Sequence, residues 1–240
     1  MSVAVISRAV HSAVVTAVCL LGIAFDANAG GAPQAQGQGP FAAVKGAAAR
    51  NQQQLQKYSW VSTTQVSYNG EVKNTKVEAV SYGPDGQLQK NVISDTAAPK
   101  PPGLRGMIAE KKGAEMQSEL ESAVELVRSY VPPNPQALQA AVAAQNMQLV
   151  PAPPGEATLV FTNYNLPGDA LTLTFAVEPK SIQTVDVSTW LGDPSKVVTL
   201  VVQFATLPDG TDHPATTTLT LPSSNLQVTV TNSNYQQVVY

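Results

Sequence analysis

Hydrophobic and polar residues alternate with a period of two in the segments on either side of Asn69-Gly70. These segments are 58–68 (YSWVSTTQVSY) and 71–82 (EVKNTKVEAVSY), and such alternation is typical of half-buried β-strands. Asn-Gly favours a two-residue turn because both positions adopt positive φ readily. The pattern therefore predicts a β-hairpin in which Tyr68 pairs with Glu71.

The register of this hairpin predicts which residues face the core. It places Trp60, Ser62 and Thr64 on the larger and more apolar face, which we expect to be buried. Lys76 and Glu78 fall on the opposite face, which is charged and rich in amides. We expect that face to contact solvent, as in an antiparallel sheet with one buried side.

Further strands continue the period-two pattern. A short strand is predicted at about 88–93, and the region after residue 158 predicts six more, at 159–164, 171–177, 182–190, 197–206, 215–221 and 226–231. The turns between them contain Gly, Pro, Asp, Asn and Ser, which favour tight turns. Because short turns join antiparallel neighbours, we predict a meander of about nine strands.

Apolar residues recur every three or four positions in two other regions. Residues 41–57 predict an amphipathic N-terminal helix, and 107–131 predict a longer helix that Gly113 is expected to break into two pieces. Asn134 is expected to cap a further short helix. The later helices form a predicted insert at about 105–149.

The order of these elements predicts an α+β, β-rich fold. A meander of about nine strands can curl strongly, and helices at its start and middle can cover the concave face. We therefore predict a curved antiparallel sheet or open half-barrel with an N-terminal helix and a mid-chain helical lid. All of it is expected to form a single domain at 41–240.

The first 29 residues have the order of a secretory signal peptide. Arg8 precedes an apolar run at 13–25, and Ala27-Asn28-Ala29 places small residues before Gly30. We expect cleavage between Ala29 and Gly30, a flexible tether at 30–40, and a periplasmic or secreted protein.

Composition narrows the possible partners. The net charge is −3 and 13% of the residues are charged, so no basic surface for nucleic acid is expected. No later stretch approaches ~18 apolar residues, so we expect no stable membrane insertion. Cys19, the one cysteine, lies inside the apolar run without a typical lipobox before it. Two alternatives stay open for Cys19: it is removed with the signal peptide, or it is lipidated.

Candidate catalytic residues are few. His213 follows Asp209 and Asp212 in the run PDGTDH, but zinc and iron sites usually use more than one imidazole or thiolate. We expect Asp212 and His213 to be solvated hairpin residues. The sequence has no Gly-x-Ser-x-Gly motif, no phosphate-binding glycine loop and no dinucleotide fingerprint. We therefore expect no cofactor, no metal and no enzymatic activity.

An apolar ligand site is the remaining candidate. Small residues such as Ser62 and Thr64 beside Trp60 fill little space, which favours a cavity beneath the helical insert. The alternative is that the same side chains simply fill the core. The candidate lining residues are Trp60, Val66, Met116, Leu120, Val124, Phe161, Leu173 and Phe175.

The chain resembles the periplasmic carriers of the LolA/LolB type, which sort outer-membrane lipoproteins. The resemblance lies in the order of elements over most of 41–235, and the segments YSW, GEVKNTK and YGPDGQLQK resemble those of uncharacterised exported bacterial proteins of this kind. It implies an unclosed half-barrel, a helical lid and an apolar cavity. In that family an arginine of the sheet locks the lid. Arg50, Arg105 and Arg128 are expected in helices or loops, so none takes that place.

Two hypotheses about function follow. The first is an exported, non-enzymatic carrier or sensor that binds a lipid or another apolar small molecule between the sheet and the helical lid. The alternative is a structural or interaction module of the cell envelope, with a filled core and no ligand. In that case a face or edge of the sheet would contact another envelope protein.

Overall fold

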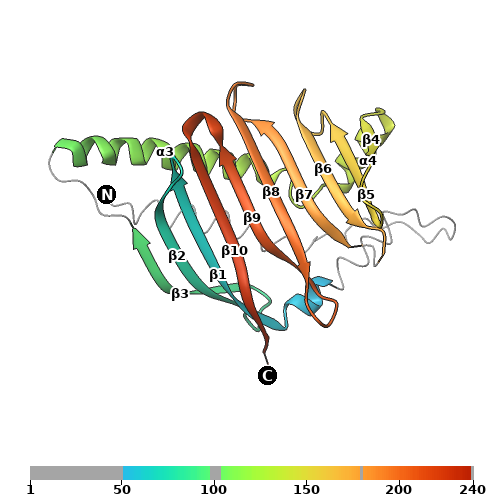
Figure 1. The fold of residues 1–240 in the computed structure, drawn as a ribbon, viewed down its shortest axis with the longest axis horizontal. Helices are drawn as coiled ribbons and strands as arrows, with labels where there is room; N and C mark the ends of the chain where they lie inside the picture. Colours follow the sequence, from blue (N-terminus) through green and yellow to red (C-terminus); the bar gives the residue numbers. More distant parts are fainter. Residues whose placement is uncertain (1–50, 98–103, 179–180, 239–240) are drawn as a thin grey trace.

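Ten strands form one open antiparallel sheet in the computed structural model, which describes residues 51–97, 104–178 and 181–238 (Figure 1). The strands are β1 (Tyr58–Tyr68), β2 (Glu71–Tyr82), β3 (Leu88–Ala97), β4 (Met147–Val150), β5 (Glu156–Thr162), β6 (Ala170–Ala176), β7 (Ile182–Trp190), β8 (Val197–Thr206), β9 (Asp212–Leu221) and β10 (Leu226–Gln237). The predicted signal peptide, the tether and the start of the N-terminal helix lie outside the described residues. Residues 51–55 are helical and lead through a turn into β1.

The helices lie between β3 and β4 along the chain. They are α3 (Leu104–Arg128) and α4 (Pro135–Ala143), and a short 3-10 helix η1 (Pro222–Ser224) joins β9 to β10. Asn134 caps α4 as predicted, because its side-chain oxygen accepts from the backbone N–H groups of Gln136 and Ala137. The mid-chain helical insert is therefore present.

The first and last strands are neighbours in the sheet. β1 pairs with β2 on one side and with β10 on the other, so the strand order is β3-β2-β1-β10-β9-β8-β7-β6-β5-β4. The two edges of the sheet are consequently β3 and β4, the strands that flank the helices along the chain. The helical insert must carry the chain from one edge to the other.

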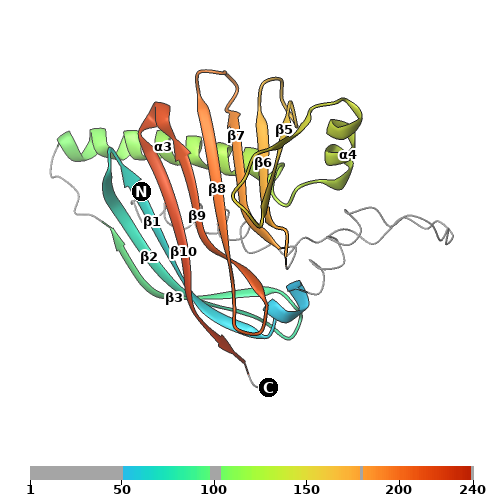
Figure 2. The ribbon, with the colours of Figure 1, turned by 45° about the vertical axis from the view of Figure 1, so that its right-hand side comes forward.

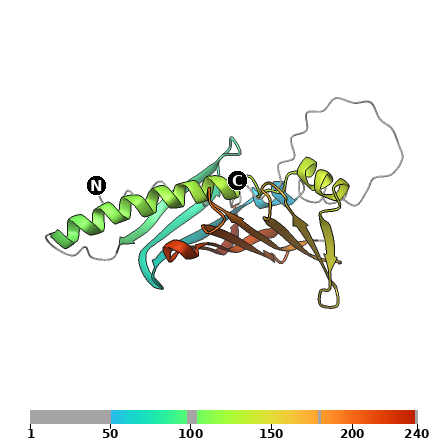
Figure 3. The ribbon, with the colours of Figure 1, turned by 90° about the horizontal axis from the view of Figure 1, so that it is seen from above.

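α3 runs along one face of the sheet as a single helix, and its first turns project beyond β2 and β3 (Figures 1 and 3). Its 25 residues span about 37 Å, close to the ~43 Å across ten strands. Lys112 Nζ lies 5.0 Å from the centre of the Tyr68 ring at the end of β1, and Ser224 of η1 donates a 2.5 Å hydrogen bond to Glu119. These contacts place α3 across the sheet, and α4 lies beside β5 (Figure 2).

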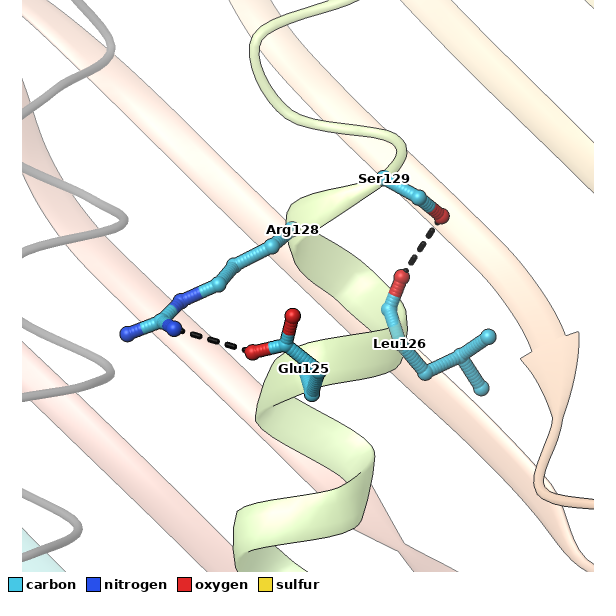
Figure 4. Close-up of polar contacts among 4 residues, drawn as sticks. All are labelled: Glu125, Leu126, Arg128 and Ser129. Atoms are coloured by element: carbon cyan, nitrogen blue, oxygen red, sulfur yellow. Dashed lines mark hydrogen bonds and ion pairs between the residues drawn. The ribbon is translucent and has the colours of Figure 1, made fainter.

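One hydrophobic core lies between the sheet and the helices. Alternate residues of β7 and β8, such as Val185 and Leu200, meet Leu120, Val124 and Val127 of α3 there. The opposite side of α3 is polar: Arg128 donates a 2.9 Å hydrogen bond to Glu125, and Ser129 bonds back to the Leu126 carbonyl (Figure 4). The helix therefore buries one face, as its apolar stripe predicts.

Two details of the insert differ from the predictions. The sequence predicted about nine strands, and the tenth is β4, which lies where the helical insert was expected to continue to 149. Four residues are too few to show alternation, and β4 forms because its backbone pairs with β5. Gly113 does not break α3, which is continuous; the cost of about 1 kcal/mol for a helical glycine is small for a helix packed along one face.

Candidate functional site

A β-bulge in the first hairpin decides which side chains face the core. Asn69 and Gly70 both have positive φ (51° and 77°), and Tyr68 pairs with Glu71 as predicted. The register then shifts by one residue between Ser67 and Val66. Because a shift of one residue exchanges the two faces of a strand, the even-numbered residues of β2 point inward beyond the bulge.

The predicted register of β2 is therefore wrong. Thr64 pairs with Lys76 and Ser62 pairs with Glu78. Lys76 and Glu78, which were expected to contact solvent, are buried on the inner face at 7% and 3% exposure. Ser62 and Thr64 are fully buried on β1, as expected. No residue of the turn signals the bulge, so the alternation of β2 was assigned to the wrong face.

A contiguous group of buried polar residues results, which we call the inner polar cluster. Its members are Ser62, Thr64, Asn74, Lys76, Glu78, Thr217 and Asn232, none more than 7% exposed. Ser62 pairs across strands with both Glu78 and Asn232, and Val230, which pairs with Thr64, pairs on its other side with Thr217. The cluster thus extends over β2, β1, β10 and β9.

The charges of the cluster compensate each other. Lys76 Nζ lies 2.6 Å from Glu78 Oε1. Burying such a pair costs several kcal/mol per ion, which mutual attraction repays only when further hydrogen bonds satisfy both groups. Here Glu78 Oε2 has no hydrogen-bond partner among the described residues. The pair is neutral but incompletely satisfied.

Other atoms of the cluster are also unpaired. Six side-chain atoms of the cluster have no hydrogen-bond partner among the described residues: Ser62 Oγ, Thr64 Oγ1, Asn74 Oδ1, Glu78 Oε2, Thr217 Oγ1 and Asn232 Oδ1. The two amides are fixed by their nitrogens: Asn74 donates to Asp95 at 3.0 Å and Asn232 donates to the Pro214 carbonyl at 2.9 Å. Each unpaired buried group costs about 1–3 kcal/mol. Native proteins hold few such groups, so six together mark this cluster as a candidate binding site.

Aromatic residues lie beside the inner polar cluster, further from α3. Trp60 stacks on Tyr235 with ring centres 5.4 Å apart, and the centre of the His213 ring lies 4.0 Å from that of Tyr235. Trp60 Nε1 and His213 Nδ1 have no hydrogen-bond partner among the described residues. Aliphatic residues lie on the other side of the cluster, nearer α3: Val66, Val228 and Leu219.

The expectation for His213 is also wrong. β9 begins at Asp212, earlier than predicted, and this places the His213 side chain inward at 6% exposure. Burial lowers the pKa of His213, outweighing its backbone hydrogen bond at Pro214 and the charge of Asp212. Asp209 accepts from the Tyr58 hydroxyl at 2.7 Å and Asp212 from Thr206 at 2.6 Å. The three residues therefore do not form one site.

The eight predicted lining residues all contact the hydrophobic core. Trp60, Val66, Leu120, Val124, Phe161 and Leu173 are buried in it, and Met116 and Phe175 are half-buried against it. Trp60 and Val66 adjoin the inner polar cluster, whereas Phe161, Leu173 and Phe175 lie on β5 and β6 in the other half of the sheet. Sequence reasoning missed the polar members Asn74, Lys76, Glu78, Thr217 and Asn232, because an apolar inner face was assumed.

A second buried polar group lies at the other end of α3. Asp169 accepts four hydrogen bonds, from the Tyr130 hydroxyl (2.5 Å) and the backbone N–H groups of Tyr164, Asn165 and Leu166. The Tyr130 hydroxyl also contacts Thr189 at 2.8 Å. Burial and the Asp169 carboxylate raise the pKa of Tyr130. This group attaches the end of α3 to the sheet and leaves none of these atoms unpaired.

Neither a cluster of metal-ligating side chains nor a membrane-spanning helix occurs in residues 51–97, 104–178 and 181–238. No three His, Cys, Asp or Glu side chains are arranged there to hold a metal ion. No helix in these ranges combines the length and hydropathy needed to cross a membrane.

No family model matches the sequence, and no curated protein matches it. The chain is similar to the crystal structure of a DUF1329 family protein from Desulfovibrio piger ATCC 29098, with a TM-score of 0.33 and 10% sequence identity over 79% of this chain and 90% of that one. At this TM-score and identity the match assigns neither a family nor a function, so the site is interpreted from its own geometry.

Proposed function

We propose that this protein is a non-enzymatic carrier or sensor that binds a lipid or another apolar ligand between the inner face of the sheet and α3. The observation that supports it most is the position of α3, a single helix laid over an apolar inner face by the connection between the two sheet edges. Such an element can separate from a face more readily than a strand can, because a strand is held by a ladder of backbone hydrogen bonds and the sheet pairing of the described residues includes strands alone.

The N-terminal segment supports an extracytoplasmic site of action. Its basic, apolar and small-residue order is that of an export signal. We propose that the mature chain acts in the periplasm or is secreted. The absence of catalysis is part of the same proposal, because His213 is buried against Tyr235 and apart from Asp209. An enzymatic activity of the wild-type protein that is lost in His213→Ala would contradict the proposed absence of catalysis.

Ligand recovery tests the proposal. The protein is purified from its native host without detergent, and the molecules it releases on denaturation are identified by mass spectrometry. In parallel, the emptied protein is titrated with a polarity-sensitive naphthylamine dye. We expect a stoichiometric acyl-chain compound and saturable dye binding. The proposal would be overturned if the protein released no compound and also failed to bind the dye.

The role of α3 as a lid is tested separately. Glu119→Cys and Ser224→Cys, which replace a hydrogen-bonded pair, are joined by a short thiol-cleavable crosslinker. We expect dye uptake to slow by about tenfold or more in the crosslinked protein and to recover after reduction. If the crosslink did not change the rate of dye uptake, ligand entry would not require movement of α3, and its role as a lid would be rejected.

A different observation favours the second candidate, an envelope interaction module. β3 is an edge strand, and its Val92 and Ile93 are 57% and 60% exposed. Such an edge can pair with a strand of another protein. Crosslinking in the native envelope would then return one stoichiometric partner, and Ile93→Lys would abolish its capture.

A further inference from the structure

We propose that the inner polar cluster is the head-group subsite of this binding face, and that it takes a neutral head group bearing several hydroxyls, such as the glycerol or sugar of a single-chain lipid. This inference rests on the proposed function and deepens it. It assigns a chemical class to the ligand, which the apolar face by itself does not.

Position is the first argument. The cluster lies between the aliphatic residues Val66, Val228 and Leu219 on the side nearer α3 and the aromatic group of Trp60 and Tyr235 on the other. An amphiphile whose chain lies on the aliphatic residues would bring its head group directly onto the cluster. The two kinds of surface are contiguous on β1, where Thr64 stands two residues from Val66 on the same face.

The types of unpaired atom are the second argument. Asn74 Oδ1, Asn232 Oδ1 and Glu78 Oε2 can only accept hydrogen bonds, whereas Trp60 Nε1 can only donate. The hydroxyls of Ser62, Thr64 and Thr217 can do either. A ligand that satisfies such a mixed set must both donate and accept. Hydroxyl groups do both, whereas an ammonium only donates and an ionised phosphate only accepts.

Charge is the third argument. Lys76 and Glu78 neutralise each other at 2.6 Å, so the cluster offers no uncompensated charge to an ion. A charged head group buried there would lose its hydration without a counter-charge, which is far more costly than burying a hydroxyl. The ion pair instead provides strong hydrogen-bonding groups at no net charge.

The experiment compares ligands that share one twelve-carbon chain. The probes are 1-monolauroylglycerol, dodecyl glucoside, methyl laurate, laurate and dodecylammonium, each used below its micelle concentration to displace the naphthylamine dye. We expect the glycerol compound, the glucoside or both to bind at least about tenfold more tightly than methyl laurate, as two or three added hydrogen bonds would give. Whichever of these two probes binds more tightly shows whether the head group is a glycerol or a sugar. Laurate and dodecylammonium are expected to bind no better than methyl laurate.

Matched variants of β2 assign the effect to the cluster. Lys76→Met with Glu78→Met removes the buried pair while keeping side-chain length. We expect this variant to bind methyl laurate as before and to lose the preference for hydroxyl head groups. Glu71→Met with Lys73→Met is the control, because that ion pair joins the same residue types at the same spacing on the same strand but is exposed. It should keep the preference.

The outcomes separate the two proposals. Three results would overturn the head-group assignment while leaving an apolar binding protein. They are equal binding of all head groups, a charged head group preferred by about tenfold, and a preference that survives in the Lys76/Glu78 variant.

Thr64→Val provides a second test if the double variant fails to fold. It should reduce the preference several-fold, and an unchanged preference in Thr64→Val would then overturn the assignment. Failure of every probe and of the dye to bind would overturn the proposed function together with this inference.

Discussion

The two ends of the inner face bury polar groups in opposite ways. Near β6 and β7, the Asp169 carboxylate accepts four hydrogen bonds, and the Tyr130 hydroxyl that reaches it comes from the segment just after α3. On β2, β1, β10 and β9, the inner polar cluster contains a buried ion pair but leaves six atoms unpaired within the described residues. The first group is complete without a ligand, and the second is not.

The difference separates attachment from recognition. A satisfied buried network stabilises one arrangement of the chain, and the Asp169 group fixes the C-terminal end of α3 against the sheet. An unsatisfied cluster costs free energy in the folded protein. On the proposed function, that cost is recovered when a ligand pairs with the cluster, so stability and binding should respond differently to substitutions at the two ends.

The largest expected effect is at the attachment end. Asp169→Ala should lower the free energy of unfolding by about 5 kcal/mol, because it leaves buried donors without an acceptor. Urea denaturation monitored by circular dichroism measures this. Asp193→Ala is the control: the Asp193 side chain accepts from the backbone N–H and the hydroxyl of Ser195 in an exposed turn, and the substitution should cost about 1 kcal/mol or less. Equal effects of the two substitutions would mean that the Asp169 network does not hold the fold.

The next effect distinguishes single from double substitutions in the cluster. Lys76→Met by itself leaves the Glu78 carboxylate buried and unpaired, and should cost about 3 kcal/mol. Replacing both residues by Met should cost little or even stabilise the protein, because a buried ion pair can be exchanged for apolar side chains of similar size. Urea denaturation of the three proteins tests this. A double variant that is less stable than Lys76→Met would contradict this expectation, because the second substitution should remove the unpaired Glu78 carboxylate rather than add a further loss.

A pair of threonines compares the two ends directly. Thr189→Val removes a hydroxyl that contacts Tyr130 and should cost about 1 kcal/mol. Thr64→Val removes a buried hydroxyl without a partner and should stabilise the ligand-free protein by a similar amount, about 1 kcal/mol. The melting temperatures should therefore shift in opposite directions. If the melting temperature fell in both variants, the two ends of the inner face would not differ in how their buried hydroxyls are satisfied.

The smallest expected effect is on pH dependence. Burial lowers the pKa of His213 in the folded protein, so below pH ~6.5 the unfolded chain binds more protons than the folded one. The stability that comes from the neutral imidazole is therefore complete above pH ~6.5 and is lost as the pH falls toward the folded-state pKa. Between pH 7.5 and 5.5 the wild type should lose more stability than His213→Gln. Parallel pH profiles would show that His213 titrates as in an exposed peptide.

The sequence was sufficient to predict most of the elements and their type. Alternation predicted the strands, Asn69-Gly70 predicted a two-residue turn, and Asn134 predicted the α4 cap. The neighbouring position of β1 and β10 was not predictable from short turns, because it depends on a pairing between the two ends of the described chain. β4 was missed because its four residues pair through the backbone.

The candidate site was predicted only on its apolar side. Trp60, Val66, Leu120 and Val124 are buried as expected, since apolar residues follow the periodicity of their elements. Lys76 and Glu78 were assigned to solvent because a bulge changes the register of β2 without changing its composition. A charged pair two residues apart on a strand is equally compatible with either face, so only the pairing of the backbone decides its burial.

Amide hydrogen exchange with and without 1-monolauroylglycerol tests the central claim, that the β1–β2 end recognises the ligand and the β6–β7 end is structural. Added ligand should slow exchange in peptides covering Tyr58–Tyr82, while exchange in peptides covering Ala170–Trp190 should stay unchanged. Slower exchange confined to Ala170–Trp190, or no change in either region at saturating ligand, would contradict it.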